Sequence, residues 1–349
     1  MNKKKLKIEA INDKCSNCGA EIKYDALSQQ LKCDNCNQIH NFDKSKDIEI
    51  HDINKISKNQ EHREWLDNNR SFQCSNCGAG IVLEKSNFSK ICPYCGSHFV
   101  SDEANLPGAK PDAILPFAFN EKMANEQFIA KVKRKFFVPK NFKKNLPTNK
   151  IRGVYIPAFS ISGDSTSTYN GWLERGSGDD TTSFHIEGST NCTHKDILVE
   201  ASSHLSDYDL KKISPYNLEN AYKYDNNFIK GYSVEHYHEV MDHIINLAHN
   251  KMEKEIKDDI LGRYRYNKVK NLDIDAKYSN EKFSYYLLPL YNLEYEYKGK
   301  KYIAHMNGQT GKIGGDLPMS GWKIALLVML LLIPFLFVFM CILITVIGF

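Results

Sequence analysis

The chain has 349 residues, of which 42% are hydrophobic and 25% charged, so its composition is that of a globular protein rather than a disordered or fibrous one. Its 46 basic and 42 acidic residues leave a net charge of only +4, which excludes a strongly basic chain held on nucleic acid by charge alone. The length is sufficient for two or three units of ordinary domain size.

The first 100 residues contain eight of the ten cysteines, in four CxxC pairs. They form two sets related by an offset of 59 residues: Cys15, Cys18, Cys33 and Cys36, then Cys74, Cys77, Cys92 and Cys95. No apolar segment of a signal peptide follows the basic N-terminal arm, residues 1–12. Because the thiols of a chain that is not exported stay reduced, tight pairs predict metal ligands rather than disulfides.

Four thiolates at the corners of a tetrahedron are the ligand set of a structural zinc ion, and CxxC lets two sulfurs reach one ion from a tight turn. We therefore predict two closed four-cysteine zinc ribbons, at residues 13–42 and 71–100, holding two structural Zn²⁺ ions. Such a turn favours a residue that tolerates positive φ after the second cysteine. Those positions hold Gly19, Asn37, Gly78 and Gly96. A redox motif has a single CxxC and does not account for two repeated sets.

Neither ribbon is basic enough to bind a polyanion strongly. Residues 71–100 contain Lys85 and Lys90 as their only basic residues, against Glu84. In the first ribbon, acidic residues offset the lysines of the N-terminal arm. The charges favour a protein partner, and a nucleic-acid partner is the alternative.

The middle of the chain predicts one mixed domain between linkers. Residues 43–70 are rich in charge and predict a solvated linker, and residues 101–113 contain turn-forming Pro and Gly and predict another. We predict an α+β domain at residues 114–316, with antiparallel strands and a helix at Glu121–Phe136. Apolar residues at every fourth position from Val240 to Ile260 indicate one long helix. Strands are predicted at residues 153–162, 165–172, 182–188, 196–201, 272–276, 283–297, 301–306 and 310–313.

The C-terminal region has a different character, because Ile324 to Ile347 is a run of 24 residues without a charge. A helix of that length is roughly 36 Å long, which exceeds the ~30 Å of a bilayer's hydrocarbon core. We predict a transmembrane helix at residues 322–347. Four lysines precede the apolar run from Ile324 and no charged residue follows it: Lys300, Lys301, Lys312 and Lys323. The positive-inside tendency then predicts a single-pass, tail-anchored protein of the cell membrane, with its N-terminal domains in the cytoplasm.

Weaker signals lie elsewhere in the chain. Residues 131–150 contain eight basic residues, no acid and three phenylalanines. They predict either a solvated helix face or a contact with anionic lipid, which we favour over a nucleic-acid groove because the domain is tethered to a membrane. We find no nucleophile–base arrangement and no pair of catalytic carboxylates, and so expect no enzyme. A hidden active site would have its cleft near Tyr155 to Trp172.

Several phrases of the sequence resemble a bacterial family of membrane proteins. These phrases are Ile114-Leu-Pro-Phe117, Gly153-Val-Tyr-Ile-Pro157 with Phe159, Tyr169-Asn-Gly171, Leu288-Pro-Leu290 leading into Tyr297-Lys-Gly-Lys300, and Asn307-Gly-Gln-Thr-Gly-Lys312. Members join one or two N-terminal ribbons, similar to that of transcription factor IIB, to a shared α+β domain and a C-terminal membrane helix. The resemblance covers nearly the whole chain.

The resemblance also implies a function. In some bacteria the family is encoded beside phage-shock-protein A-like and SPFH/virion-core-like proteins, which implies an adaptor in an envelope-stress assembly at the membrane. Members are often labelled replication or primosome proteins, which corresponds to the alternative of a membrane-tethered nucleic-acid binder. The family offers no catalytic residues, and the eight cysteines are the only functional positions that it implies here.

Overall fold

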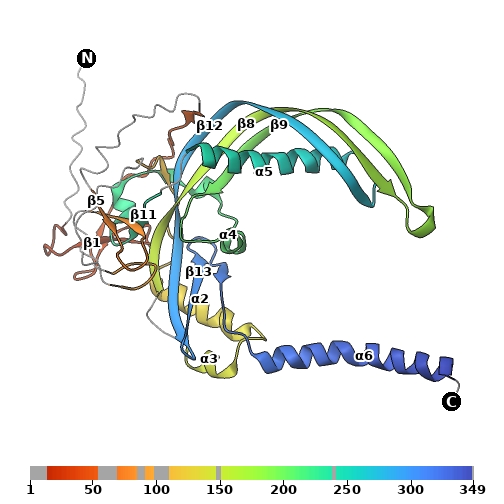
Figure 1. Cartoon of the computed structure of the whole chain (residues 1–349). Helices are drawn as coiled ribbons and strands as arrows, with labels where there is room; N and C mark the ends of the chain where they lie inside the picture. Colours follow the sequence, from red (N-terminus) through yellow and green to blue (C-terminus); the bar gives the residue numbers. More distant parts are fainter. Residues whose placement is uncertain are drawn as a thin grey trace.

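Two very long antiparallel strands organise the structure (Figure 1). β8 (Ile151–Arg175) and β12 (Lys268–Tyr297) pair along nearly their whole length, from Lys268 opposite Glu174 to Leu293 opposite Ile151. The computed structural model describes residues 14–53, 69–84, 91–97, 110–146, 151–237 and 241–347. Both strands are rich in aromatic and β-branched residues, which pack well on a pleated surface.

Around this pair, the described residues form a sheet of 11 strands. Its path runs β10-β7-β12-β8-β11-β6-β5, while β9 pairs with β8, β4 and β13 pair with β12, and β14 pairs with β13. The remaining strands of this sheet are β4 (His51–Asp52), β5 (Asn69–Gln73), β6 (Gly80–Glu84), β7 (Ala113–Ile114), β9 (Thr182–Glu200), β10 (Tyr222–Lys223), β11 (Ser233–Glu235), β13 (Lys300–Asn307) and β14 (Ile313–Gly315).

A second, three-stranded sheet belongs to the first ribbon and has the order β1-β2-β3. It consists of β1 (Ile22–Asp25), β2 (Gln30–Cys33) and β3 (Ile39–His40). The α-helices of the described ranges are α2 (Glu121–Arg134), α3 (Lys140–Lys144), α4 (Asp207–Ile213), α5 (Met241–Gly262) and α6 (Gly321–Ile347). Short 3-10 turns occupy Gly178–Asp180, Leu218–Asn220 and Asn226–Ile229.

The outer halves of β8, β9 and β12 form a curved arm, and α5 lies along its concave side (Figure 1). The residues of α5 that face the arm are fully buried, and they include Ile244, Ala248, Met252, Ile256 and Ile260. This is the apolar stripe that the four-residue spacing predicts, so the long helix is confirmed. Val240, where that spacing begins, lies outside the described residues.

The inner halves of the same strands are covered on both faces. Along β8, Tyr155 and Phe159 belong to one apolar cluster, which includes residues of the first ribbon, α2 and α3. Val154 and Ile156 point the other way, into a second cluster that includes residues of the second ribbon and α4. Because neighbouring side chains of a strand point to opposite faces, the first ribbon packs on the face of Tyr155, while Cys74 and Cys92 of the second ribbon pack on the face of Val154.

Secondary structure departs from expectation chiefly in strand length. The segments 153–162 and 165–172 are one strand, β8, and 182–188 and 196–201 are both parts of β9. Likewise 272–276 and 283–297 are joined in β12, and the strand expected at 310–313 begins only at Ile313. The polar runs between these segments suggest loops, but each continues a strand that is hydrogen-bonded to a neighbour: the runs in β9 and β12 pair with β8, and the run in β8 pairs with both.

α6 extends away from the rest of the structure as one uninterrupted helix that contains Pro334 (Figure 1). Of the helices whose side chains are described, which for α6 means Gly321 to Phe335, none is both long enough and apolar enough to cross a membrane. The predicted transmembrane helix at residues 322–347 therefore stays a prediction.

Candidate metal centres

Four turns with the same backbone geometry present the eight cysteines. The residue after the second cysteine of each pair has positive φ, namely Gly19 (73°), Asn37 (60°), Gly78 (78°) and Gly96 (70°). The N–H group of that residue donates to the carbonyl oxygen of the first cysteine of its pair, over 2.8 to 3.1 Å. The left-handed turn predicted from the sequence is confirmed at all four places, and it brings both sulfurs of a pair to one side.

The sulfurs of each set converge. The distances are 3.5 Å for Cys15–Cys36, 3.5 Å for Cys18–Cys33, 3.6 Å for Cys74–Cys95 and 3.7 Å for Cys77–Cys92. All four sulfurs of a set lie within 4.8 Å of one another. A tetrahedron of sulfurs about 2.3 Å from a central ion has edges of about 3.8 Å. Both groups are therefore positioned to bind a metal ion, and four thiolates are a donor set that suits zinc rather than calcium or magnesium.

Hydrogen bonds from neighbouring polar side chains orient the ligands. Asn17 bonds to Cys36 and Asn76 bonds to Cys95, so the Asn of each CSNC phrase contacts the last sulfur of its own ribbon. A second polar side chain approaches the first sulfur of each group. His40 Nε2 lies 3.3 Å from Cys15 Sγ, and Ser97 Oγ lies 3.7 Å from Cys74 Sγ. The cysteine spacing does not predict these four contacts. Only Asn17 and Asn76 have a signal in the sequence, namely the Asn that recurs in both CSNC phrases.

The thiols of a group differ in acidity. A backbone hydrogen bond from Ala20 and a side-chain bond from Asn35 lower the pKa of Cys18 to about 6. Burial opposes ionisation of Cys95, but hydrogen bonds from Asn76 and Ser97 outweigh it and lower its pKa to about 6. Burial raises the pKa of Cys77 to about 11. Without a metal ion, repulsion between closely spaced thiolates prevents all four thiols from ionising. A divalent cation removes this repulsion and binds all four as thiolates.

The first ribbon is packed firmly against the α+β domain. The rings of Tyr24 and Phe42 lie 5.4 and 5.0 Å from that of Phe228. Gln29 Nε2 donates to the carbonyl oxygen of Phe117 at 2.7 Å, and the Tyr24 N–H group donates to the Lys230 carbonyl at 3.0 Å. Aromatic contacts and backbone bonds therefore fix this ribbon on the sheet.

The second ribbon is part of the large sheet itself, because β6 pairs with β11 through Val82 opposite Val234. Next to that pairing, the buried carboxylate of Glu235 accepts hydrogen bonds from the Tyr94 hydroxyl and from Ser202 Oγ at 2.8 Å. Burial raises the pKa of Glu235. Tyr94 lies inside the CPYC motif, so this hydrogen bond connects a cysteine turn of the second ribbon directly to the domain. The sequence alone does not predict this contact, because 141 residues separate the two partners.

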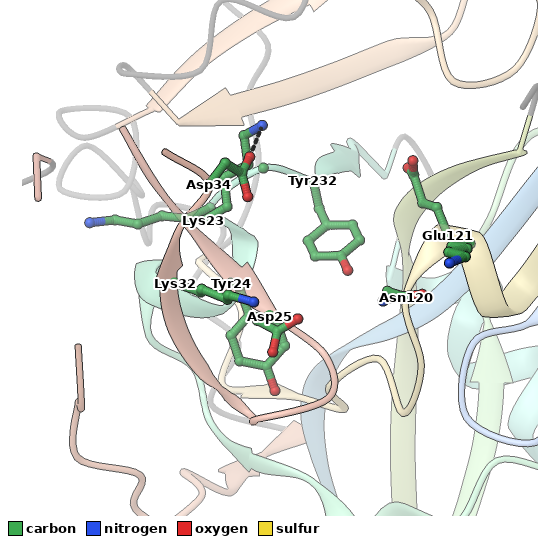
Figure 2. A pocket seen from close by; sticks show the side chains of 11 residues that line it. Lys23, Tyr24, Asp25, Lys32, Asp34, Asn120, Glu121 and Tyr232 are labelled. Carbon is green, nitrogen blue, oxygen red and sulfur yellow. Dashed lines mark hydrogen bonds and ion pairs between the residues drawn. The ribbon is translucent and has the colours of Figure 1, made fainter. Parts of the chain in front are cut away.

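A cavity of about 400 Å³ lies where the first ribbon meets the domain. Figure 2 shows Tyr232 and Asp25 pointing into it, with Glu121 on the opposite wall. Lys23 and Asp34, which also line it, form an ion pair at 2.9 Å. Burial raises the pKa of Glu121. Because the walls combine both signs of charge, the cavity has no strong preference for an anion or a cation.

The structure also brings together a line of polar groups that the sequence does not reveal. Ser165 Oγ lies 2.9 Å from His194 Nε2, and His194 Nδ1 lies 2.7 Å from Glu255 Oε2 on α5. The order matches a nucleophile, a base and an orienting carboxylate. Ser165 and His194 are each only 2% exposed, however, and β8 is hydrogen-bonded to a strand on either side, so its N–H groups cannot form an oxyanion hole. These two hydrogen bonds instead connect α5 to the arm.

A third group of metal-ligand types, Glu49, His51 and Asp112, connects the segment after the first ribbon to the sheet. His51 Nε2 lies 2.7 Å from Asp112 Oδ1, and Glu49 accepts from Lys223 at 2.7 Å. These two interactions explain why the three side chains lie together, and no metal ion is needed to hold them.

This chain is similar to a protein of Bacillus subtilis, the uncharacterized protein YdjG. The two sequences are 26% identical over 324 residues, which cover 90% of this chain and 92% of the relative. No family model matches the sequence, and no solved structure matches it. The likeness is that of a distant homologue that matches this chain over most of its length.

Proposed function

We propose that this protein is a membrane-anchored zinc-ribbon adaptor that recruits protein partners to the membrane. The main support is the convergence of four sulfurs in each group, since a zinc ion held by all four would have no coordination position left for water or substrate. Zinc at such a site supplies folding free energy and shape rather than a reaction. A ribbon whose metal site is closed to substrate is therefore suited to binding rather than to catalysis.

The surface of the first ribbon suits a protein partner. Leu27 is 55% exposed and Ile39 is 47% exposed. Of the charges on the same ribbon, Lys23 and Asp34 neutralise each other in an ion pair, while Lys32 lies opposite Ile39. Exposed apolar side chains beside neutralised charges favour contact with protein, whereas a phosphate backbone requires unpaired cations.

Support for a membrane anchor comes from α6. Its described side chains from Ile324 to Phe335 are apolar and exposed, with Leu330 at 58% and Phe335 at 74%. An apolar helix that the other described residues leave exposed is stable in a hydrocarbon phase, and the sequence continues it without a charge to Ile347. With four lysines ahead of the span, the ribbons would lie in the cytoplasm.

The resemblance suggests which partners to expect, namely phage-shock-protein A-like or SPFH-like proteins in an envelope-stress assembly. The competing proposal is a membrane-tethered nucleic-acid binder. It is tested with the full chain in detergent, titrated with duplex and single-stranded DNA over a salt series. The adaptor hypothesis predicts weak binding to DNA. Tight DNA binding that falls steeply with salt concentration would contradict it.

Partner recruitment is tested by affinity capture from detergent-solubilised membranes. We expect the variant L27D/I39D to lose the recovered partner while its metal content stays that of the wild type. Ile303 on β13 is 42% exposed and distant from the ribbons in sequence, so I303D is the matched control and should retain the partner. Equal recovery with all three proteins would refute a role for the ribbon surface.

A further inference from the structure

The start of α6 is bound to the turn between α2 and α3. The Ser320 N–H group donates to the Phe137 carbonyl at 2.8 Å, and Lys323 Nζ donates to the carbonyl oxygens of Phe136 at 2.6 Å and Val138 at 3.1 Å. Lys323 is only 6% exposed, and its Nζ lies 5.0 Å from the centre of the Phe136 ring. These bonds fix the first turn of α6 against residues 136–138.

α3 joins the same surface to the end of β12. The ring of Phe142 lies 5.1 Å from that of Tyr295 and 5.2 Å from that of Tyr297. Lys143 Nζ donates to the carbonyl of Lys133, at the end of α2, at 2.8 Å. Figure 1 shows α3, the end of β12 and the start of α6 together at the bottom of the view. Two segments that are far apart in sequence thus lie near the root of α6: residues 133–146 contact it directly, and the end of β12 packs against α3.

The exposed charged side chains of these segments are mostly basic. We call six of them the basic collar: Arg134, Lys135, Lys140, Lys144, Lys298 and Lys300. Acidic residues are few in residues 133–146, 294–302 and 316–323. Glu296 and Asp316 are exposed, and Glu294 is paired with Lys301 at 3.6 Å. The root of α6 therefore has a clear positive excess.

Large apolar side chains project beside the collar. Phe136 is 63% exposed, Met319 is 69% exposed and Trp322 is 65% exposed. Aromatic side chains with lysines around them are typical of the level where a helix enters a bilayer, and each lysine near an anionic surface shifts binding roughly fivefold. Charge and apolar surface here point to the same occupant, a lipid surface.

We propose that the basic collar lies against the anionic headgroups of a phospholipid bilayer that α6 enters, with Phe136, Met319 and Trp322 at headgroup level. This inference rests on the proposed membrane anchor and adds a preference for anionic lipid to it. The collar would hold the α+β domain close to the membrane in a fixed orientation, so that the ribbons are presented to partners from one side.

The test uses the full chain in lipid nanodiscs of phosphatidylcholine, alone or mixed with phosphatidylserine, and measures hydrogen exchange of the amides in residues 133–146 and 296–302. We expect several-fold slower exchange with phosphatidylserine. The variant K140Q/K144Q/K298Q should lose this slowing. The control K254Q/K257Q/K277Q removes the same charge from exposed lysines of α5 and the arm, and should keep it.

Exchange rates that do not change with phosphatidylserine, or that change equally in both triple variants, would contradict the proposed contact between the basic collar and anionic lipid. Anchoring is read separately, from flotation with neutral vesicles after a high-salt wash. A chain that fails to float contradicts the anchor. The collar is then judged by the same exchange measurement on vesicles, where protection by phosphatidylserine supports it and no protection overturns it.

Discussion

The side-chain amides of Asn17 and Asn76 occupy equivalent places in the two ribbons, each bonded to the last sulfur of its group. A donor to a ligand sulfur holds the thiolate in place and stabilises its charge, and loss of such a partner commonly costs 10–100-fold in metal affinity.

We therefore predict that N17A and N76A each speed zinc release to a chelator by roughly tenfold or more, from one ribbon only. Ser16 and Ser75 precede these residues in the same turns and are exposed, so S16A and S75A are the matched controls. Release that is as slow in the Asn variants as in the Ser variants would show that the amides do not support the sites.

Burial lowers the pKa of His305 to about 4, and its Nδ1 lies 2.6 Å from Asn292 Oδ1. The folded state thus holds this imidazole neutral, whereas in the unfolded chain its pKa is about 6.5. Its contribution to stability is complete above pH 6.5 and is lost as the pH falls toward 4, so protonation costs about 2 kcal/mol by pH 5.

We predict that the free energy of unfolding of H305Q depends less on pH than that of the wild type between pH 7 and 5. Acid also releases zinc from the thiolates, but this affects both proteins, so the difference between them isolates His305. Parallel pH profiles would contradict the assignment.

At the scale of elements, α5 and the long strands show what a local pattern can and cannot predict. The spacing of Ile244, Ala248 and Met252 defines the buried face of α5 without knowledge of its partner. The 30 residues of β12 are not predictable in this way, since strands are typically 3–10 residues long and the polar segment Lys277–Lys282 suggests a turn. The pairing with β8 continues past a bulge near Asn280, which has φ of 54°.

The packing of α5 on the arm leads to a stability prediction. Met252 is fully buried, and M252A should lower the free energy of unfolding by about 2–5 kcal/mol, because it leaves a cavity between α5 and the strands. E253A, at the exposed neighbouring position, should change it by less than about 0.5 kcal/mol. Equal effects in chemical denaturation would mean that α5 does not pack as described.

At the scale of the whole molecule, the cysteine pairs predict the metal groups because each turn is built from residues adjacent in sequence. The attachment of the ribbons to the domain is different, since it depends on partners such as Val82 with Val234 and Tyr24 with Phe228, which no local pattern connects. Metal loss should therefore disturb the faces of the large sheet as well as the ribbons.

We predict two zinc ions per chain, and native mass spectrometry of the full chain from detergent tests this most directly. The mass should show two Zn²⁺ for the wild type and one for each of the variants C33S and C92S, which remove a single ligand from one group. A metal-free chain whose mass indicates disulfides, or a single variant that loses both ions, would contradict two independent four-cysteine sites.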